Sequence, residues 1–230
     1  MNFAEILFLL ALDPKEGKIK PELDRYLDYA LAGALLMDLA LQNRIDTDVT
    51  CLRQGSSEES RDPLLLRVVN KQPTGDALVD DVLKKLQYKP DPRPTRDWLD
   101  YFSKEGKREG KSIRKNVMDH LVAKGVLRIE EKTMLLFFKT HRYFAADPAE
   151  IDEVKKRLRE LVLDDEIPDP RETVLVALAN ARGLFGELFS AGELERARPR
   201  INTLRKLDLI GQAMFHIIRD VEHSITTEVH

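Results

Sequence analysis

Six basic side chains gather within twelve residues of the chain, in a pattern that could hold an anion. They are Lys104, Lys107, Arg108, Lys111, Arg114 and Lys115. Two acidic residues, Glu105 and Glu109, reduce these six positive charges to a net charge of +4. If the segment enters a helix, at least two of the last three cations share one side, and such a pair can bind a phosphate group. The alternative is a solvated helix end without a ligand.

Motifs for catalysis or metal binding are missing from the sequence. There is no glycine-rich phosphate loop, no Gly-x-Ser-x-Gly, no His-Glu-x-x-His and no Cys-x-x-Cys. Cys51 has no assignable base, and adjacent acids such as Asp80 and Asp81 point in different directions on a helix. The histidines are scattered at His120, His141, His216, His223 and His230. We therefore expect no catalytic residue, no metal site and no cofactor, and the chain is predicted not to be an enzyme.

The composition narrows the class of protein. The chain has 230 residues, of which 43% are hydrophobic and 33% charged, with a formal net charge of −3. This balance excludes a disordered or membrane-spanning chain, and it provides no overall attraction to nucleic acid. A single cysteine cannot form an internal disulfide, so a cytoplasmic protein is expected.

Two apolar segments near the start are better explained as core helices than as membrane signals. Residues 1–12 contain Glu5 and lack both the basic start and the cleavage site of a signal peptide. Residues 27–41 contain Asp28 and Asp38 and are too short and too charged to span a bilayer.

Helix signals cover most of the chain and predict a mainly α, single-domain helical bundle over residues 1–230. Asn2 and Glu5 resemble a capping box, and Thr95 is expected to cap a short helix that carries Trp98. Asp147 and Asp169 are each followed by proline and, three residues on, by glutamate, which is a strong helix start. Further helices are expected over residues 23–43, 77–86, 112–123, 148–163, 171–182, 183–189, 191–206 and 208–221, with a break or kink at Pro199.

A β-hairpin at about residues 126–143 is the predicted exception to the helical pattern. Val126–Ile129 and Met134–Phe138 are β-prone, and the polar residues Glu130–Thr133 between them predict a turn. The second run carries four consecutive large apolar residues, so both faces of that strand would be apolar. One face can pack on the helices, and the other needs a second subunit, a lipid surface or more core. These four residues are Leu135, Leu136, Phe137 and Phe138.

Several blocks of the sequence, in the same order, resemble the Golgi phosphoprotein 3 family. The most specific are Pro-Thr-Gly-Asp at residues 73–76 and Lys-Gly-Val-Leu at residues 124–127. The apolar run 5–12, the small-residue helix 33–41 and the run 135–137 also match. The chain begins at the first helix and resembles a bacterial-type member without the N-terminal tail.

The resemblance implies a helical bundle wrapped by amphipathic helices, with a projecting hairpin used for membrane contact and self-association. Eukaryotic members bind phosphatidylinositol 4-phosphate on Golgi membranes and sort glycosyltransferases. Their headgroup pocket uses a tryptophan and three arginines. Two arginines fall on Lys111 and Arg114, the third on Ala32, and the tryptophan near Glu22 or Leu23.

Three functions follow as hypotheses. The first is a non-enzymatic peripheral membrane protein in the cytoplasm that binds anionic phospholipid headgroups through Lys111, Arg114, Arg108 and Lys115. Its hairpin would contact the membrane or form a homo-oligomer. The second is a cytosolic protein-binding adaptor that self-associates through the hairpin. The third, a winged-helix-like nucleic-acid binder, is disfavoured because the isoelectric point is about 6.0.

Overall fold

The structure is a computed structural model, and helices dominate it, as predicted. It describes residues 1–24, 27–47, 65–89, 93–105, 112–134, 138–164, 166–181 and 183–207. Within these ranges the helices are α1 (Phe3–Ala11), α2 (Pro21–Asp24), α3 (Leu27–Leu41), α4 (Ala77–Tyr88), α5 (Thr95–Lys104), α6 (Ile113–Ala123), α7 (Pro148–Leu163), α8 (Pro170–Ala181), α9 (Leu184–Leu188) and α10 (Ala191–Leu207).

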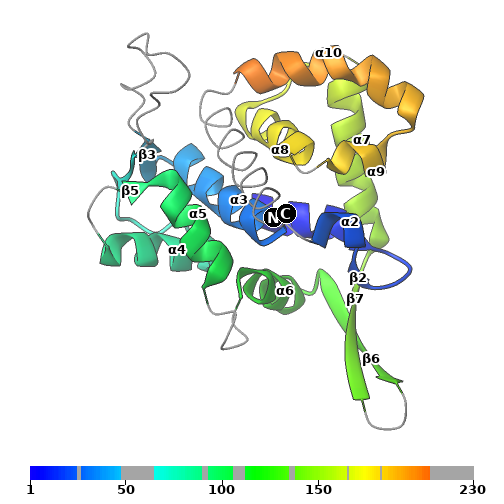
Figure 1. Ribbon diagram of the computed structural model, residues 1–230, viewed down its shortest axis with the longest axis horizontal. Coiled ribbons are helices and arrows are strands. Elements are labelled where there is room, and N and C mark those ends of the chain that lie inside the picture. The colour runs from blue at the N-terminus through cyan, green and yellow to red at the C-terminus, as the bar shows by residue number, and fades with distance from the viewer. Residues whose placement is uncertain are drawn as a thin grey trace, which may run out of the picture.

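Three small antiparallel sheets within the described ranges join these helices (Figure 1). β1 (Leu12–Asp13) pairs with β2 (Lys18–Ile19), and β6 (Leu127–Met134) pairs with β7 (Phe138–Ala145). The third sheet has the order β3–β4–β5 and consists of β3 (Ile45–Thr47), β4 (Leu65–Val68) and β5 (Arg93–Pro94). This third sheet was not predicted from the sequence.

The centre of the molecule is built on α1 and α3. All nine residues of α1 are buried, and α3 is buried on every side because small residues let its neighbours approach closely. Helices α4 and α5 pack on one side of α3, and α7, α8 and α10 lie toward the other (Figure 1). None of the helices in the described ranges is long and apolar enough to cross a bilayer.

Most of the predicted helix starts are confirmed by their capping bonds. Asn2 and Glu5 form the reciprocal capping box, and Asp147 accepts a hydrogen bond from the Ala149 N–H. Asp169 and Glu172 likewise bond each other's backbone N–H groups. The prediction for Thr95 is wrong, because Pro94 occupies the N-cap position and no side chain caps the helix.

Two predicted helix bounds differ from the structure. Residues 23–43, predicted as one helix, contain the end of α2 and the whole of α3. A break at Pro199 is wrong, since α10 continues through that residue to Leu207. Cys51 and the predicted helix at 208–221 lie outside the described residues.

The hairpin exists, but its turn is not where the sequence placed it. Glu130–Thr133, predicted as the turn, belong to β6 and pair with residues of β7, as in Glu130↔Arg142 and Thr133↔Lys139. The last pair is Met134↔Phe138, so residues 135–137 connect the strands and lie outside the described residues. The predicted division of Leu135–Phe138 between two strand faces therefore concerns mainly residues outside the described part of the chain. A projecting two-stranded ribbon is solvated on both faces, so polar residues can occupy its strands.

The base of the hairpin docks on the turn between β1 and β2. The Tyr143 N–H donates a hydrogen bond of 2.9 Å to the Gly17 carbonyl, and Arg142 Nη1 lies 2.8 Å from Glu16 Oε2. Gly17 has a φ of +61°, and a Cβ there would lie 2.8 Å from Phe144 Cζ. Glycine is thus required both by the backbone conformation and by the close approach of the hairpin.

We expect Gly17→Ala to destabilise the fold more than Gly183→Ala does. Gly183 has a similar φ of +66°, but a Cβ there would have no neighbour within 4 Å, so it carries only the backbone strain. That strain is about 1–2 kcal/mol, and Gly17→Ala adds the clash with Phe144. Urea denaturation of both variants measures the difference. Equal losses of unfolding free energy would show that the Phe144 ring moves aside for the Cβ at residue 17 without a measurable cost in stability.

Candidate functional site

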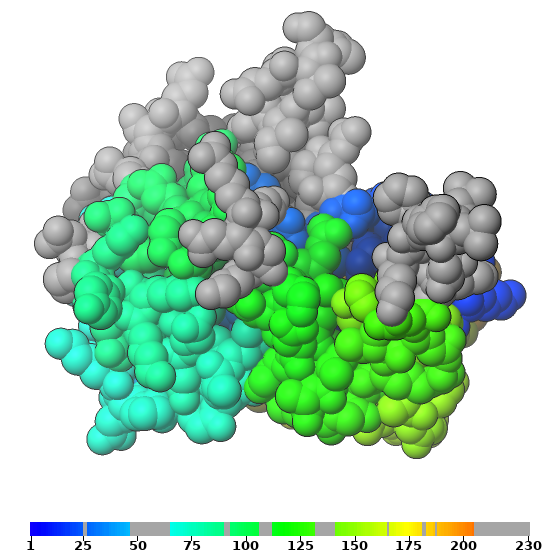
Figure 2. All heavy atoms as spheres, turned by 90° about the horizontal axis from the view of Figure 1, so that it is seen from below, coloured from blue at the N-terminus to red at the C-terminus, as the bar shows by residue number. Residues whose placement is uncertain are grey.

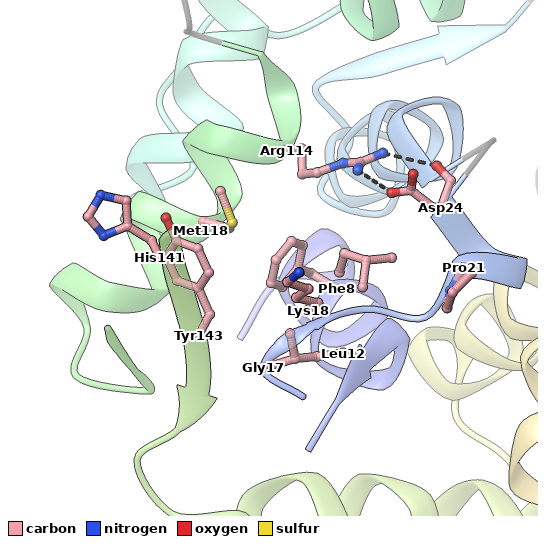
Figure 3. A pocket seen from close by; sticks show the side chains of 11 residues that line it. Phe8, Leu12, Gly17, Lys18, Pro21, Asp24, Arg114, Met118, His141 and Tyr143 are labelled. Atoms are coloured by element: carbon pink, nitrogen blue, oxygen red, sulfur yellow. Dashed lines mark hydrogen bonds and ion pairs between the residues drawn. The ribbon is translucent and has the colours of Figure 1, made fainter. Parts of the chain in front are cut away.

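A pocket of about 380 Å³ opens where the hairpin base meets α6 and the β1–β2 turn (Figure 3). It collects side chains from segments that are distant in sequence, including α1, β2, α2, α6 and β7. Its lining residues are Phe8, Leu12, Gly17, Lys18, Ile19, Pro21, Asp24, Arg114, Met118, His141 and Tyr143.

The lining combines an apolar floor with charged groups. The buried residues Phe8 of α1 and Leu12 of β1 form the floor together with Met118 of α6. Lys18 and Arg114 contribute positive charge, and Asp24 contributes negative charge. Such a lining suits a ligand that has both an apolar part and an anionic group.

Arg114 lies in the first turn of α6 and is held by two carboxylates. Its Nε donates to Asp28 Oδ1 at 3.1 Å, its Nη2 donates to the Asp24 carbonyl at 3.0 Å, and its Nη1 bonds Asp24 Oδ1. The Asp28 side chain is 13% exposed, whereas that of Asp24 is 54% exposed. Asp28 is therefore an inner partner that orients the guanidinium, and Asp24 is an outer partner in contact with water.

Of the four predicted anion-binding residues, Arg114 is the one that the structure places at the pocket. Arg114 lines the pocket, whereas Lys115 bonds Asp119 one turn further along α6 and does not line it. Lys111 and Arg108 lie outside the described residues. Lys104, in the same basic segment, pairs with Asp100 at 3.4 Å. The basic residues of this segment that the structure describes are thus each paired with a carboxylate.

The positions aligned with the family's other headgroup residues do not line the pocket. Ala32 is 1% exposed within α3, and Leu23 is 4% exposed in α2. Trp98 is also buried, and its ring stacks on Phe102 with centroids 5.7 Å apart. Lys18, His141 and Tyr143 were missed by sequence reasoning, because only the long-range docking of the hairpin brings them to the pocket.

Comparison with known proteins decides the family. The family model described as Golgi phosphoprotein 3 matches residues 3–221. The chain belongs to the Golgi phosphoprotein 3 family. A relative, the vacuolar protein sorting-associated protein 74 of Eremothecium gossypii, is 26% identical over 252 residues, covering 100% of this chain and 74% of the relative. The resemblance read from the sequence is confirmed.

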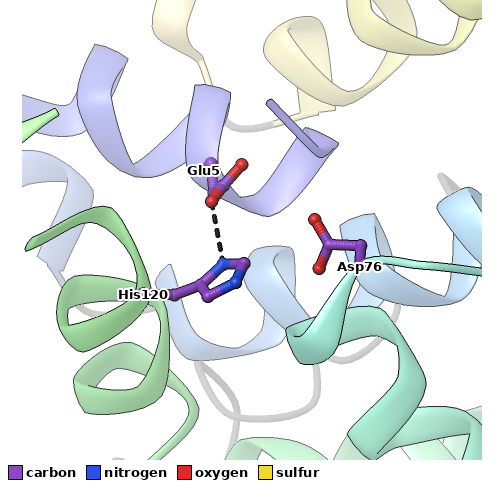
Figure 4. Close-up of side chains that lie close together, drawn as sticks. All are labelled: Glu5, Asp76 and His120. Carbon is purple, nitrogen blue, oxygen red and sulfur yellow. Dashed lines mark hydrogen bonds and ion pairs between the residues drawn. The ribbon is translucent and has the colours of Figure 1, made fainter. Parts of the chain in front are cut away.

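The two blocks most specific to the Golgi phosphoprotein 3 family meet at a second cluster of charged residues. Asp76 ends the first block, Lys124 begins the second, and both lie against Glu5 of α1. His120 Nδ1 is 2.9 Å from Glu5 Oε1, and Figure 4 shows Asp76 beside this pair. The cluster is a structural contact between segments that are far apart along the chain.

Glu5, Asp76 and His120 could in principle hold a metal ion, since one ligand atom from each lies within 4.8 Å of the others. The Lys124 ammonium, however, already provides a positive charge there. Its Nζ lies 2.8 and 3.1 Å from the two Glu5 oxygens and 3.4 Å from Asp76 Oδ2. We therefore interpret the cluster as an ion-pair network rather than a metal centre.

Two pKa shifts reflect this network. Burial alone would lower the pKa of the Lys124 ammonium, but Glu5 and Asp76 raise it above its usual value. Burial alone would raise the pKa of Asp76, but hydrogen bonds from the Val79 N–H and Asn2, with the charge of Lys124, lower it. A carboxyl whose folded pKa is lowered adds stability above its unfolded pKa, and that stability is lost as the pH falls through the folded pKa.

Lys124→Met should destabilise the protein by about 3 kcal/mol, because the fully buried Glu5 would lose its main compensating charge. Lys115→Met is the matched control on the same helix, since its partner Asp119 is 54% exposed. Its expected effect is below about 1 kcal/mol. Urea denaturation at neutral pH gives both values. Similar small losses in both variants would contradict a structural role for the network.

Proposed function

We propose that this protein is a non-enzymatic peripheral membrane protein that binds anionic phospholipid headgroups in the pocket around Arg114. The observation that carries the proposal is an arginine at the side of a pocket with an apolar floor, directly beside the base of the projecting hairpin. Family membership indicates phosphatidylinositol 4-phosphate as the headgroup. The expected location is the cytoplasmic surface of a membrane.

The arrangement suits a lipid because it separates two kinds of contact. The guanidinium of Arg114 can bind a phosphate through two parallel hydrogen bonds, while Phe8 and Met118 face the less polar part of the headgroup. Lys18 approaches from β2 as a second positive charge. We include Lys111, Arg108 and Lys115 in the basic surface that surrounds this pocket.

Charge alone is too weak for stable attachment. At about 1 kcal/mol per basic residue near an anionic surface, a net +4 segment gives roughly millimolar affinity. The carboxylates around Arg114, Lys104 and Lys115 reduce that contribution further. A second contact is therefore needed, and the hairpin is the element that projects far enough to make it (Figure 1).

The hairpin lies on the same face as α6, as the view from below shows (Figure 2). We propose that Leu135, Leu136, Phe137 and Phe138, at the distal end of the strands, insert into the membrane or form a homo-oligomer. Apolar side chains buried in this way contribute about 1.5–3 kcal/mol each. An isolated two-stranded hairpin is only marginally stable in water, so a partner for its outer end would also stabilise it.

Binding to vesicles tests the headgroup site. Arg114→Gln should weaken binding to phosphatidylcholine vesicles containing phosphatidylinositol 4-phosphate by at least fivefold, since one basic contact is worth about 1 kcal/mol. Arg198→Gln is the matched control, because Arg198 is 64% exposed on α10, at the other end of the molecule from the hairpin (Figure 1). Flotation at two salt concentrations measures both. Equal binding by the two variants would refute the Arg114 site.

The hairpin end needs a separate variant. We expect the triple change Leu135→Ser, Leu136→Ser, Phe137→Ser to reduce vesicle binding and self-association together. The unfolding free energy should stay within about 1 kcal/mol of the original, because these residues connect the distal ends of the strands. Analytical ultracentrifugation, flotation and urea denaturation provide the three readings. Self-association lost without any change in vesicle binding would favour the protein-binding adaptor.

A further inference from the structure

The two carboxylates that hold Arg114 differ in how firmly they are placed. Asp28 belongs to the long helix α3, and its side chain is 13% exposed. Asp24 is the last residue of the four-residue helix α2, and its side chain is 54% exposed. Asp24 lines the pocket and Asp28 does not. A phosphate that approaches Arg114 from the pocket therefore meets Asp24 and not Asp28.

Asp24 takes one N–H of each terminal nitrogen of Arg114, and a phosphate would compete for these donors. Its carboxylate bonds Nη1 and its carbonyl accepts from Nη2, whereas Nε is bonded to Asp28. In Figure 3 the guanidinium points at Asp24 across the edge of the pocket. Turning the Asp24 side chain out to water frees Nη1 and removes the competing negative charge, while the Asp24 carbonyl stays on Nη2 and Asp28 keeps the guanidinium oriented.

The charge balance makes this displacement selective. Lys18 and Arg114 carry two positive charges, and Asp24 and Asp28 carry two negative charges, so the pocket attracts a further anion only weakly. A phosphodiester has the same single charge as the Asp24 carboxylate and gains little by replacing it. A phosphomonoester carries about −1.5 to −2 charges and three acceptor oxygens, so it competes far better.

We propose that Asp24 is an internal competing anion that makes the Arg114 site selective for phosphomonoesters over phosphodiesters. The proposal rests on the proposed function and adds a residue that determines which lipids can bind. The negative charge of Asp24 would repel phosphodiester lipids, and such repulsion of unwanted ligands is a common source of selectivity.

The test compares two lipids that differ by one phosphomonoester group, phosphatidylinositol and phosphatidylinositol 4-phosphate, each in phosphatidylcholine vesicles. We expect the unaltered protein to prefer the 4-phosphate lipid. Asp24→Asn should increase binding to phosphatidylinositol by about fivefold, because one opposing charge is removed, and should increase binding to the 4-phosphate lipid less. The preference between the two lipids should therefore narrow.

Asp46→Asn is the matched control for loss of a negative charge. Asp46 has the same 54% exposure as Asp24, but it lies on β3, where it pairs with Arg67. It should leave the lipid preference unchanged. Asp24→Ser serves as a second variant that also removes the carboxylate, and overlapping unfolding curves confirm that each variant is folded.

The outcomes separate the two proposals. If Arg114→Gln weakens binding but neither Asp24 variant narrows the preference, the role of Asp24 is overturned and the headgroup site stands. If neither the unaltered protein nor the Asp24 variants bind either vesicle, the headgroup site itself is overturned. Inorganic phosphate added as a competitor identifies the source of the anion. Release from 4-phosphate vesicles at micromolar phosphate would assign the site to the free ion and overturn the lipid assignment.

Discussion

A fully buried carboxylate, that of Glu5, constrains the whole arrangement of this protein. A charge removed from water needs compensating partners, and here they come from the end of α6 and from the N-cap of α1. Lys124 and His120 approach from the end of α6, and the Asn2 N–H donates a 2.8 Å hydrogen bond within α1. The start of α4 joins through Asp76, which also receives the Asn2 amide. Helices α1, α4 and α6 are thereby fixed relative to one another.

A second buried acid, Asp38, links α1 to α3 and, through Arg171, to α8 in the second half of the chain. Asp38 of α3 accepts a 2.7 Å hydrogen bond from the Phe3 N–H and an ion pair of 3.1 Å from Arg171 of α8. Burial raises the pKa of Asp38, while those two partners act in the other direction. Because α6 is anchored at its far end by Lys124, its first turn presents Arg114 to the pocket and its continuation leads into the hairpin. The same network thus positions both elements of the proposed membrane contact.

Sequence reasoning succeeded where the deciding interactions are local. The caps at Asn2, Asp147 and Asp169 involve partners two or three residues away, so a short stretch of sequence contains the complete signal. It failed where distant partners decide. Strands β3 to β5 have two to four residues each and depend on pairing across long intervals. The carboxylates that hold Arg114 lie 86 and 90 residues away in the chain, so neither its orientation nor its neutralisation could be predicted. The hairpin turn was misplaced because an apolar run resembles a strand and a polar run resembles a turn, whereas pairing from the fixed base sets the register.

The docking of the hairpin on the β1–β2 turn has a mechanical consequence. Tyr143 and Gly17 are joined by a backbone hydrogen bond, and both of them line the pocket. The base of the hairpin therefore forms one wall of the pocket proposed as the headgroup site. From the distal pair Met134↔Phe138 to the pair Ile129↔Tyr143 at that wall there are six paired positions, and the opposite wall is held by the anchored helix α6. In the proposed function, a contact at the tip and a ligand in the pocket would therefore act on the same wall.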